Sequence, residues 1–345
     1  MRRPLHQIAV VAFLAGCMQP PLMTAPVPLS APASFADAVS LVARRQASDD
    51  SVVVTGGRSL LLTHGARTPR VFVLLHGFTD LPEQFAVVGQ HLFAAGDNVY
   101  IPRLPRHGTR RAPMRSLGRI SAEELAQFGD SCVTIASGLG DSIIVVGLSA
   151  GGAVAASVAQ SHAEVRRAVL IAPAIAAGLI SDDAGHGLVV VASRLPEITR
   201  TNAPIDTTRS DYVQGITTHG LAQILRLGEA VREASAAREP ATKNMSFLLN
   251  EADHTVSDQA AMNLAQNWSA HGARVAIHRF PASLALPHNV LETDARGGNV
   301  ALVFPVVEAL ALGVTPPTMP EQVLEVHRDV CTGWRCALKR ATGLP

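Results

Sequence analysis

The segment 147–151 reads Gly147-Leu148-Ser149-Ala150-Gly151 and lies where a run of β-branched residues gives way to alanines. A serine with glycines two positions before and after it is typical of a nucleophile elbow, a sharp turn from a strand into a helix. Small neighbours are needed because larger side chains would collide with the adjoining strand and helix. The spacing fits neither common phosphate-binding loop, and a turn without chemistry needs only one glycine. We therefore predict that Ser149 is a nucleophile.

A nucleophilic serine needs a base that removes its proton and a third group that orients the base. After such an elbow, the expected order along the chain is serine, acid, histidine. We predict His288 as the base, because it lies in the loop after the last expected strand. His278 falls inside that strand and is the weaker choice. His254, beside the predicted acid, stays a candidate.

The acid should lie just past a strand. We predict Asp253, in the loop between an expected strand and the next helix, with Glu251 and Asp258 as competitors. Asp258 falls at a helix start, where a carboxylate simply favours the helix dipole.

Acyl transfer also requires N–H groups that stabilise an oxyanion. The elbow offers the amide of Ala150. The second amide is expected in the loop after the third expected strand, where Phe78 follows His76-Gly77. A turn with a buried imidazole is the alternative interpretation of that His-Gly pair.

Short β-like runs alternate with amphipathic helices, which predicts an α/β fold with an eight-stranded, mostly parallel sheet flanked by helices. The expected strands are Ser51–Thr55, Leu60–Thr63, Val71–Leu75, Asn98–Ile101, Ile143–Gly147, Ala168–Ala172, Met245–Leu249 and Arg274–Arg279. The expected helices are Glu83–Ala95, Ala122–Ser137, Gly151–Ser161, Gln259–His271 and Asn299–Leu312. Residues from about 175 to 241 are too many for a simple connection and lack a strand, so we interpret them as an inserted helical cap.

Four segments in this order resemble the α/β-hydrolase superfamily, and within it bacterial carboxylesterases and monoacylglycerol lipases. They are VLLHGFTD (73–80), GLSAGG (147–152), EADHTV (251–256) and LPHNV (286–290). The resemblance covers roughly Val52 to Leu312. It implies that Ser149, Asp253 and His288 form a catalytic triad, with the amides of Phe78 and Ala150 as the oxyanion hole.

Two positions depart from that family. The chain reads Pro105-Arg106-His107-Gly108 where members often have Pro-Gly-His-Gly, and Asn289 follows His288 where many have Asp. Neither change removes a catalytic group, but both weaken any transfer of substrate specificity.

The mechanism implied is acyl transfer to Ser149 and then to water, without metal or organic cofactor. Carboxylic esters are the expected substrates, including lipid-derived ones such as monoglycerides or lysophospholipids. A peptidase or amidase of the same fold is the alternative, and a non-catalytic binding protein is a second one. Acidic residues for an amino-terminal substrate group are available at Asp182, Asp183 and Glu197. The apolar segments 187–192 and 221–228 either line an acyl pocket or pack within the fold.

The amino terminus predicts export. Arg2 and Arg3 precede a short apolar run, and Leu14-Ala15-Gly16-Cys17 resembles the bacterial lipobox, which implies a signal peptide over 1–16 and membrane anchoring through lipidated Cys17. Proline-rich residues 17–35 would be a tether, and 36–345 the hydrolase domain with its cap. By the same resemblance, Met18 in place of Asp favours the periplasmic side of the outer membrane. An ordinary secreted protein is the alternative.

Composition and cysteines set further limits. A formal net charge of +1 gives no global field for nucleic acid, so we expect no such partner. Six arginines between 103 and 119 either contact an anionic group or form a solvated loop. Cys331 and Cys336 could oxidise to a local disulfide or remain two free thiols, and their surroundings match no zinc pattern. Cys132 is expected in the core.

Overall fold

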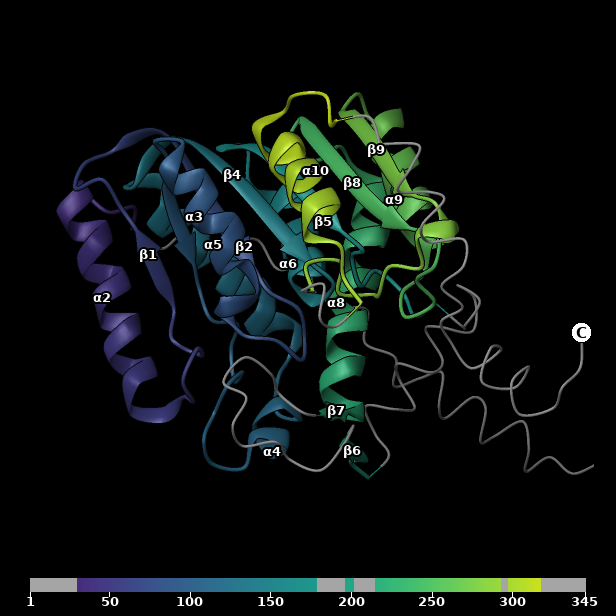
Figure 1. The fold of residues 1–345 in the computed structure, drawn as a ribbon, viewed down its shortest axis with the longest axis horizontal. Helices are drawn as coiled ribbons and strands as arrows, with labels where there is room; N and C mark the ends of the chain where they lie inside the picture. Colours follow the sequence, from purple (N-terminus) through teal and green to yellow (C-terminus); the bar gives the residue numbers. More distant parts are fainter. Residues whose placement is uncertain (1–29, 179–195, 202–214, 293–296, 318–345) are drawn as a thin grey trace, which may run out of the picture.

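The computed structural model describes residues 30–178, 196–201, 215–292 and 297–317. Its centre is a twisted seven-stranded sheet in the order β1-β3-β2-β4-β5-β8-β9 (Figure 1). Only β1 runs antiparallel to its neighbour. The strands are β1 (Leu60–Leu62), β2 (Thr68–Leu75), β3 (Asn98–Ile101), β4 (Gly140–Leu148), β5 (Val165–Ile171), β8 (Asn244–Asn250) and β9 (Arg274–Phe280).

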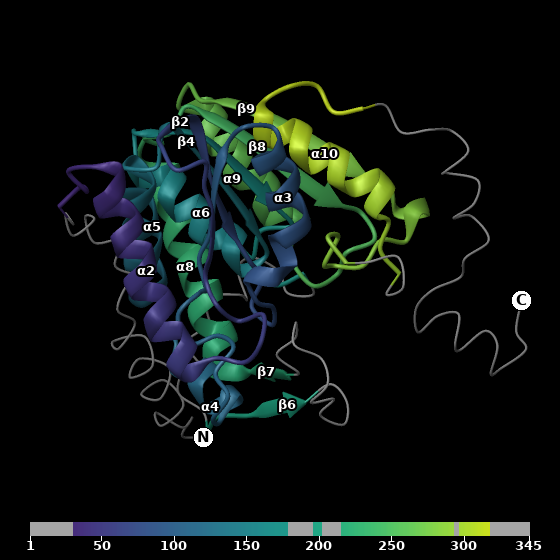
Figure 2. The ribbon, with the colours of Figure 1, turned by 60° about the vertical axis from the view of Figure 1, so that its left-hand side comes forward.

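Helices cover both faces of this sheet, as buried parallel strands require. Residues of β2 alternate between two cores: Val71, Val73 and Leu75 pack under α5 and α6, whereas Phe72 and Leu74 pack under α3 and α10. Figure 2 shows these two layers on opposite sides of the strands. The helices are α2 (Phe35–Val52), α3 (Ala86–Ala94), α5 (Ala122–Ser137), α6 (Ala150–Ser161), α8 (Thr218–Ala237), α9 (Asp258–Ala270) and α10 (Val300–Leu312), with the short helices η1 (Pro82–Phe85) and η2 (Ala282–Leu284) in loops.

The expected first strand, Ser51–Thr55, is wrong. Helix α2 continues through Val52, and Val53 makes only an isolated bridge to Thr109. The helix is capped by Ser34, whose side chain accepts a hydrogen bond from the Asp37 N–H. The run of three valines at its end has the composition of a strand, but here it closes a helix. The sheet therefore has seven described strands instead of eight.

Part of the predicted cap region lies outside the described residues, including the apolar segment 187–192. The described part contains a small antiparallel pair, β6 (Thr199–Thr201) and β7 (Gly215–Thr217), followed by α8, so the expectation that this region lacks a strand is wrong. The side chain of Thr217 caps α8 by accepting a hydrogen bond from the Gly220 N–H. In α8 the side chains of Ile224 and Leu227 are buried in the core beneath α5 and α6, so most of segment 221–228 packs within the fold. The cap itself stays a prediction.

The arginine-rich stretch is partly structural. Arg103 forms an ion pair of 2.8 Å with Asp49, and Arg106 forms one of 2.8 Å with Glu124. Arg106 has a φ of 65°, a conformation that favours glycine, which is the residue often found at this place in the related motif. The short helix α4 (Pro113–Leu117) occupies the later part of the stretch.

The cysteines and the amino terminus carry the remaining predictions. Cys132 is buried in α5, as predicted. Cys17, Cys331 and Cys336 lie outside the described residues. In the described part of the chain, no helix is long and apolar enough to cross a membrane.

Candidate active site

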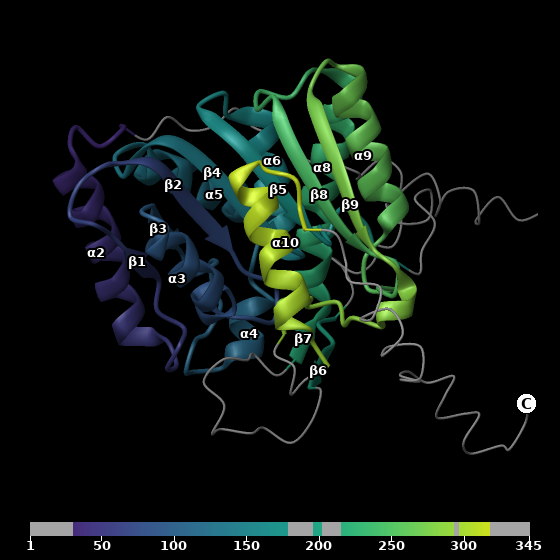
Figure 3. The same cartoon turned by 45° about the horizontal axis from the view of Figure 1, so that its top comes forward.

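Four of the predicted site residues follow the carboxyl ends of parallel strands, where active sites of open α/β sheets form. Phe78 follows β2, Ser149 follows β4, and Asp253 follows β8. His288 lies in the loop beyond β9 and η2. Figure 3 shows these strands running side by side in one sheet, so their ends meet along one edge.

Ser149 has a strained backbone, with φ 55° and ψ −112°. Its backbone is fixed from several sides: the Ser149 N–H donates to the Ile171 carbonyl at 2.9 Å, and its own carbonyl accepts from the Ala153 and Ala174 amides. The elbow glycines are required because a side chain at either position would collide with nearby backbone atoms. A Cβ on Gly151 would collide with the carbonyl oxygen of Leu75, and one on Gly147 would collide with that of Gly151.

The structure brings the three predicted polar residues into one hydrogen-bonded chain. The Nε2 atom of His288 lies 2.9 Å from Ser149 Oγ, and its Nδ1 atom lies 2.6 Å from Asp253 Oδ2. With Asp253 accepting, Nδ1 carries the proton and Nε2 is free to accept the serine hydroxyl. Such an arrangement can transfer the serine proton to the imidazole while the carboxylate holds the ring.

The environment of Asp253 keeps it ionised. Burial alone raises the pKa of the Asp253 carboxyl, but the hydrogen bond and charge of His288, with the Thr255 amide at 2.8 Å, outweigh burial and leave that pKa below its usual value. The side chain of Asp253 is only 1 % exposed, so its carboxylate is directed inward. A buried carboxylate with these partners can stabilise an imidazolium.

The competing residues lie elsewhere. Glu251 accepts a hydrogen bond from the Ala282 N–H, and Asp258 is the first residue of α9. His254 is exposed, whereas His278 packs edge-on against Phe280 in β9. Across the described residues, no group of three or more His, Cys, Asp or Glu side chains could hold a metal ion.

The loop that carries Phe78 is fixed by its neighbours. The Leu104 N–H donates to His76 Nε2 at 3.0 Å, so Nδ1 bears the proton and donates to the Gly77 carbonyl at 2.8 Å. In a trans peptide the carbonyl and the following N–H point in opposite directions. Pinning the Gly77 carbonyl therefore fixes the direction of the Phe78 N–H. Burial, with the neighbouring charge of His107, lowers the pKa of His76 and keeps this imidazole neutral.

The second predicted amide belongs to the start of α6. Ala150 is the first residue of that helix, and the first N–H groups of a helix have no intrahelical carbonyl to bind. The amide of Ala150 thus has no intrahelical partner, and it lies next to Ser149, where it would stabilise the oxyanion.

Sequence reasoning missed three residues that hold the loops of the site. Asn250, at the end of β8, donates through Nδ2 to the carbonyls of Leu286 and Pro287, just before His288. Gln84 accepts the Gly77 N–H at 2.9 Å and donates to Asp80 Oδ2 at 2.7 Å.

Asp80 joins two of these loops. The same Asp80 oxygen also accepts from Asn289 Nδ2 at 3.3 Å, so one carboxylate links the loop of Phe78 to the loop of His288. The signal in the sequence was the acid directly after HGFT, together with the unusual Asn289.

A model of the "Alpha/beta hydrolase family" matches residues 72–323, which is more than half of the chain and includes every residue of this site. The chain belongs to that family.

Among relatives of this α/β hydrolase, a thermostable monoacylglycerol lipase from Bacillus sp. (strain H-257) is 30% identical over 143 residues, which are 38% of this chain and 52% of the lipase. The chain therefore spans about half the length of the curated relative it matches. Solved structures agree in fold. The monoacylglycerol lipase of Paleococcus ferrophilus aligns with a TM-score of 0.54 at 18% identity, covering 74% of this chain and 98% of that one.

A soluble variant of the monoglyceride lipase of Saccharomyces cerevisiae, solved with a substrate analogue, gives a TM-score of 0.54 at 14% identity. It covers 78% of this chain and 91% of that one. These two solved structures agree with this chain in fold.

Proposed function

We propose that this α/β hydrolase is a serine hydrolase that cleaves carboxylic esters through an acyl-enzyme. Ser149 is the nucleophile, His288 the general base and acid, and Asp253 the group that orients His288. The amides of Phe78 and Ala150 stabilise the oxyanion. The observation that carries the proposal is the hydrogen-bonded chain from Ser149 Oγ through His288 to Asp253.

The reaction has two halves. In the first, Ser149 Oγ attacks the ester carbonyl, its proton passes to His288 Nε2, and the tetrahedral intermediate collapses as His288 protonates the leaving alcohol. In the second, His288 takes a proton from a water molecule as that water attacks the acyl-serine, and the second tetrahedral intermediate collapses to the acid as His288 returns the proton to the leaving Ser149 Oγ. We expect the amides of Phe78 and Ala150 to stabilise each tetrahedral oxyanion, and stabilisation of this kind supplies a large part of the rate enhancement.

For the substrate class, we propose lipid-derived esters with a single acyl chain, such as monoglycerides or lysophospholipids. The relative named as a monoacylglycerol lipase supports this class. Amide hydrolysis by the same residues is the second candidate. Of the acids that would favour it, Glu197 is engaged by His219 at 3.1 Å, so that alternative gains no support from this residue.

The deciding experiment is hydrolysis of p-nitrophenyl esters from acetate to palmitate, and of a monoglyceride, by the full chain. Ser149→Ala is expected to reduce kcat by about 10⁶-fold, to background. Ser283→Ala, a change at an exposed serine within η2, is the matched control and should retain full activity. A folded protein without turnover on any ester would refute the proposal, and turnover of peptide amides instead would establish the second candidate.

We also propose that Cys17 is lipidated and holds the enzyme on the periplasmic side of the outer membrane. The lipobox-like tetrad Leu14-Ala15-Gly16-Cys17 is the observation behind it. Cys17→Ala is expected to move the enzyme from the membrane fraction to the soluble fraction. An unchanged distribution of the variant would contradict the anchor.

A further inference from the structure

A second polar site lies at the opposite edge of the sheet, where β5, β8 and β9 begin. Arg274 pairs in register with Asn244, and Arg167 stands one residue before the next pair, Ala168 with Met245. Arg167, Asn244 and Arg274 therefore form one row across three strands and share one face of the sheet. Together with Arg166 they line a cavity of about 420 Å³.

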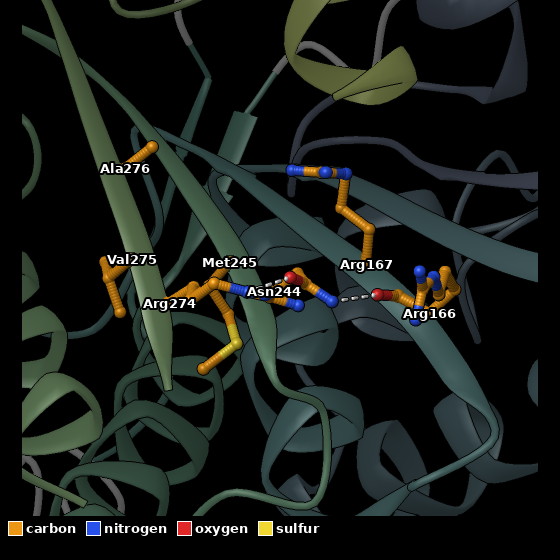
Figure 4. Close-up of a pocket in the computed structure, with 7 residues that line it drawn as sticks. All are labelled: Arg166, Arg167, Asn244, Met245, Arg274, Val275 and Ala276. Carbon is orange, nitrogen blue, oxygen red and sulfur yellow. Dashed lines mark hydrogen bonds between the residues drawn. The ribbon is translucent and has the colours of Figure 1, made fainter. Parts of the chain in front are cut away.

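Asn244 organises this cavity. Its Oδ1 accepts a hydrogen bond from Arg274 Nε at 2.9 Å, and its Nδ2 donates to the Arg166 carbonyl at 3.0 Å. Figure 4 shows Asn244 between the two, with the Arg167 guanidinium turned toward the side of β8 and β9. Because only Nε of Arg274 is used, its two terminal nitrogens keep their donors.

The charges here are not compensated. In the described part of the chain, none of Arg166, Arg167 and Arg274 forms an ion pair. Arginines near the start of β2, at the same edge of the sheet, do: Arg67 lies 2.9 Å from Asp141, and Arg70 lies 2.9 Å from Asp97. Other arginines along this edge of the sheet are thus paired with a carboxylate, whereas the arginines of the cavity are not.

The pKa of Arg167 is lowered, as expected where positive charges are not compensated. Burial, and then the positive charges of Arg166 and Arg274, lower the pKa of Arg167. Its hydrogen bond to a described side chain is a long one, 3.5 Å to Ser246 Oγ. An anion in the cavity would relieve this repulsion.

A structural role at the end of α10 does not account for the arginine. Arg167 lies against Gly313, which follows that helix. However, the last turn is closed by backbone, because the Gly313 and Val314 amides donate to the carbonyls of Leu310 and Ala309. The guanidinium therefore retains donors for a ligand.

We propose that this cavity is a binding site for a phosphate-type oxyanion, held by Arg167 and Arg274 with Arg166 at its rim. Guanidinium groups present paired N–H donors that match the oxygens of phosphate. The ligand is either free phosphate or the phosphodiester of a lipid head group. The site lies at the edge of the sheet opposite Ser149 and takes no part in ester hydrolysis.

The test uses the full chain carrying Cys17→Ala, so that an acyl anchor does not hold the protein on vesicles. Binding of inorganic phosphate is measured by calorimetry and by thermal shift at constant ionic strength, with chloride as the reference. Binding to phosphatidylglycerol vesicles is measured by sedimentation against phosphatidylcholine vesicles. The variants are Arg167→Gln and Arg274→Gln. Arg44→Gln, an equal change of charge at an exposed position on α2, is the control.

Phosphate is expected to bind saturably and to raise Tm, with affinity reduced by about tenfold or more in the Arg167 and Arg274 variants and unchanged in the Arg44 variant. Sedimentation with phosphatidylglycerol that depends on the same two arginines would identify a lipid head group as the source; phosphate binding alone would identify the free anion. Equal binding by all variants, or none to either ligand, would overturn the proposal. Ester hydrolysis should be the same in all four proteins, which separates this test from that of the catalytic site.

Discussion

The carboxylate of Asp80 is expected to set the distance between the loop of the oxyanion amide and the loop of the catalytic histidine. It accepts from Gln84 at 2.7 Å and from Asn289 at 3.3 Å through one oxygen. Asp80→Ala removes both bonds. The Gly77 amide then loses the support of a correctly oriented Gln84, and Asn289 keeps its hydrogen bonds within its own loop, to Glu292 and to the Leu291 N–H, but loses its bond to the loop of Phe78.

The hydrogen bonds that Asp80 accepts from Gln84 and Asn289 are expected to contribute different free energies. A hydrogen bond to a charged group contributes about 1.5–3 kcal/mol. Asp80 and Asn289 are both half-buried and their contact is long, so the coupling between them should fall below that range, at about 1 kcal/mol. That corresponds to about fivefold in rate. The shorter bond to Gln84 adds to the effect of Asp80→Ala, and a misplacement approaching 1 Å can cost about 10²-fold. We therefore expect kcat to fall by about 10- to 100-fold in Asp80→Ala and less in Asn289→Ala.

The assay is a double-mutant cycle of Asp80→Ala and Asn289→Ala, with kcat and KM measured on a short-chain p-nitrophenyl ester. Asp80→Asn is the conservative control, because an amide oxygen can still accept both hydrogen bonds, and it should retain most of the activity. Effects that simply add, or a change confined to KM, would refute the reasoning. So would a loss in Asp80→Asn equal to that in Asp80→Ala.

Three further changes have defined outcomes. Asp253→Asn should lower kcat by about 10⁴-fold in a folded protein, because an amide favours the wrong tautomer of His288; a loss below tenfold in the ester assay would contradict this. Gly151→Ala should lower the free energy of unfolding by about 4 kcal/mol or more, because its Cβ would meet the Leu75 carbonyl, and denaturant unfolding or loss of folded protein would register it. Burial lowers the pKa of His107 from 6.5 to about 4, so between these pH values the unfolded state binds more protons and stability falls on acidification. His107→Gln should reduce the stability difference between pH 7 and pH 4 by about 3 kcal/mol; denaturant unfolding that shows the same pH dependence in both proteins would contradict this.

The parts of the fold that sequence predicted are those with a local signal. Buried apolar runs located the seven strands of the sheet, and the expected helix Ala122–Ser137 has the bounds of α5. The pattern failed at residues 35–55, where α2 was missed and its valine-rich end was interpreted as a strand. Composition alone does not distinguish a β-branched helix end from a short strand, and the helix is stabilised here by packing of Ala38 and Val42 against the core.

The candidate site likewise contains residues that could be predicted from the sequence and residues that could not. Ser149, Asp253 and His288 were predicted from a motif and from chain order, and they lie in one hydrogen-bonded chain; their catalytic roles stay predictions. Asn250 and Gln84 had no local signal in the sequence. Asn250 binds backbone carbonyls of a loop that is distant in sequence, and Gln84 binds a single backbone amide. Such residues become visible only when the loops are placed in space.

Two kinds of support therefore hold the site. The elbow is fixed by backbone contacts with β2 and β5, and its glycines allow no larger residue, so changes there should unfold the protein. The loops of His288 and Phe78 are fixed by side chains, Asn250 and Asp80, that reach across from other elements. Because those side chains hold loops and not the core, their loss should appear first in kcat. Substitutions in the elbow should therefore lower the stability of the protein, whereas substitutions of the side chains that hold the loops should lower the rate of turnover.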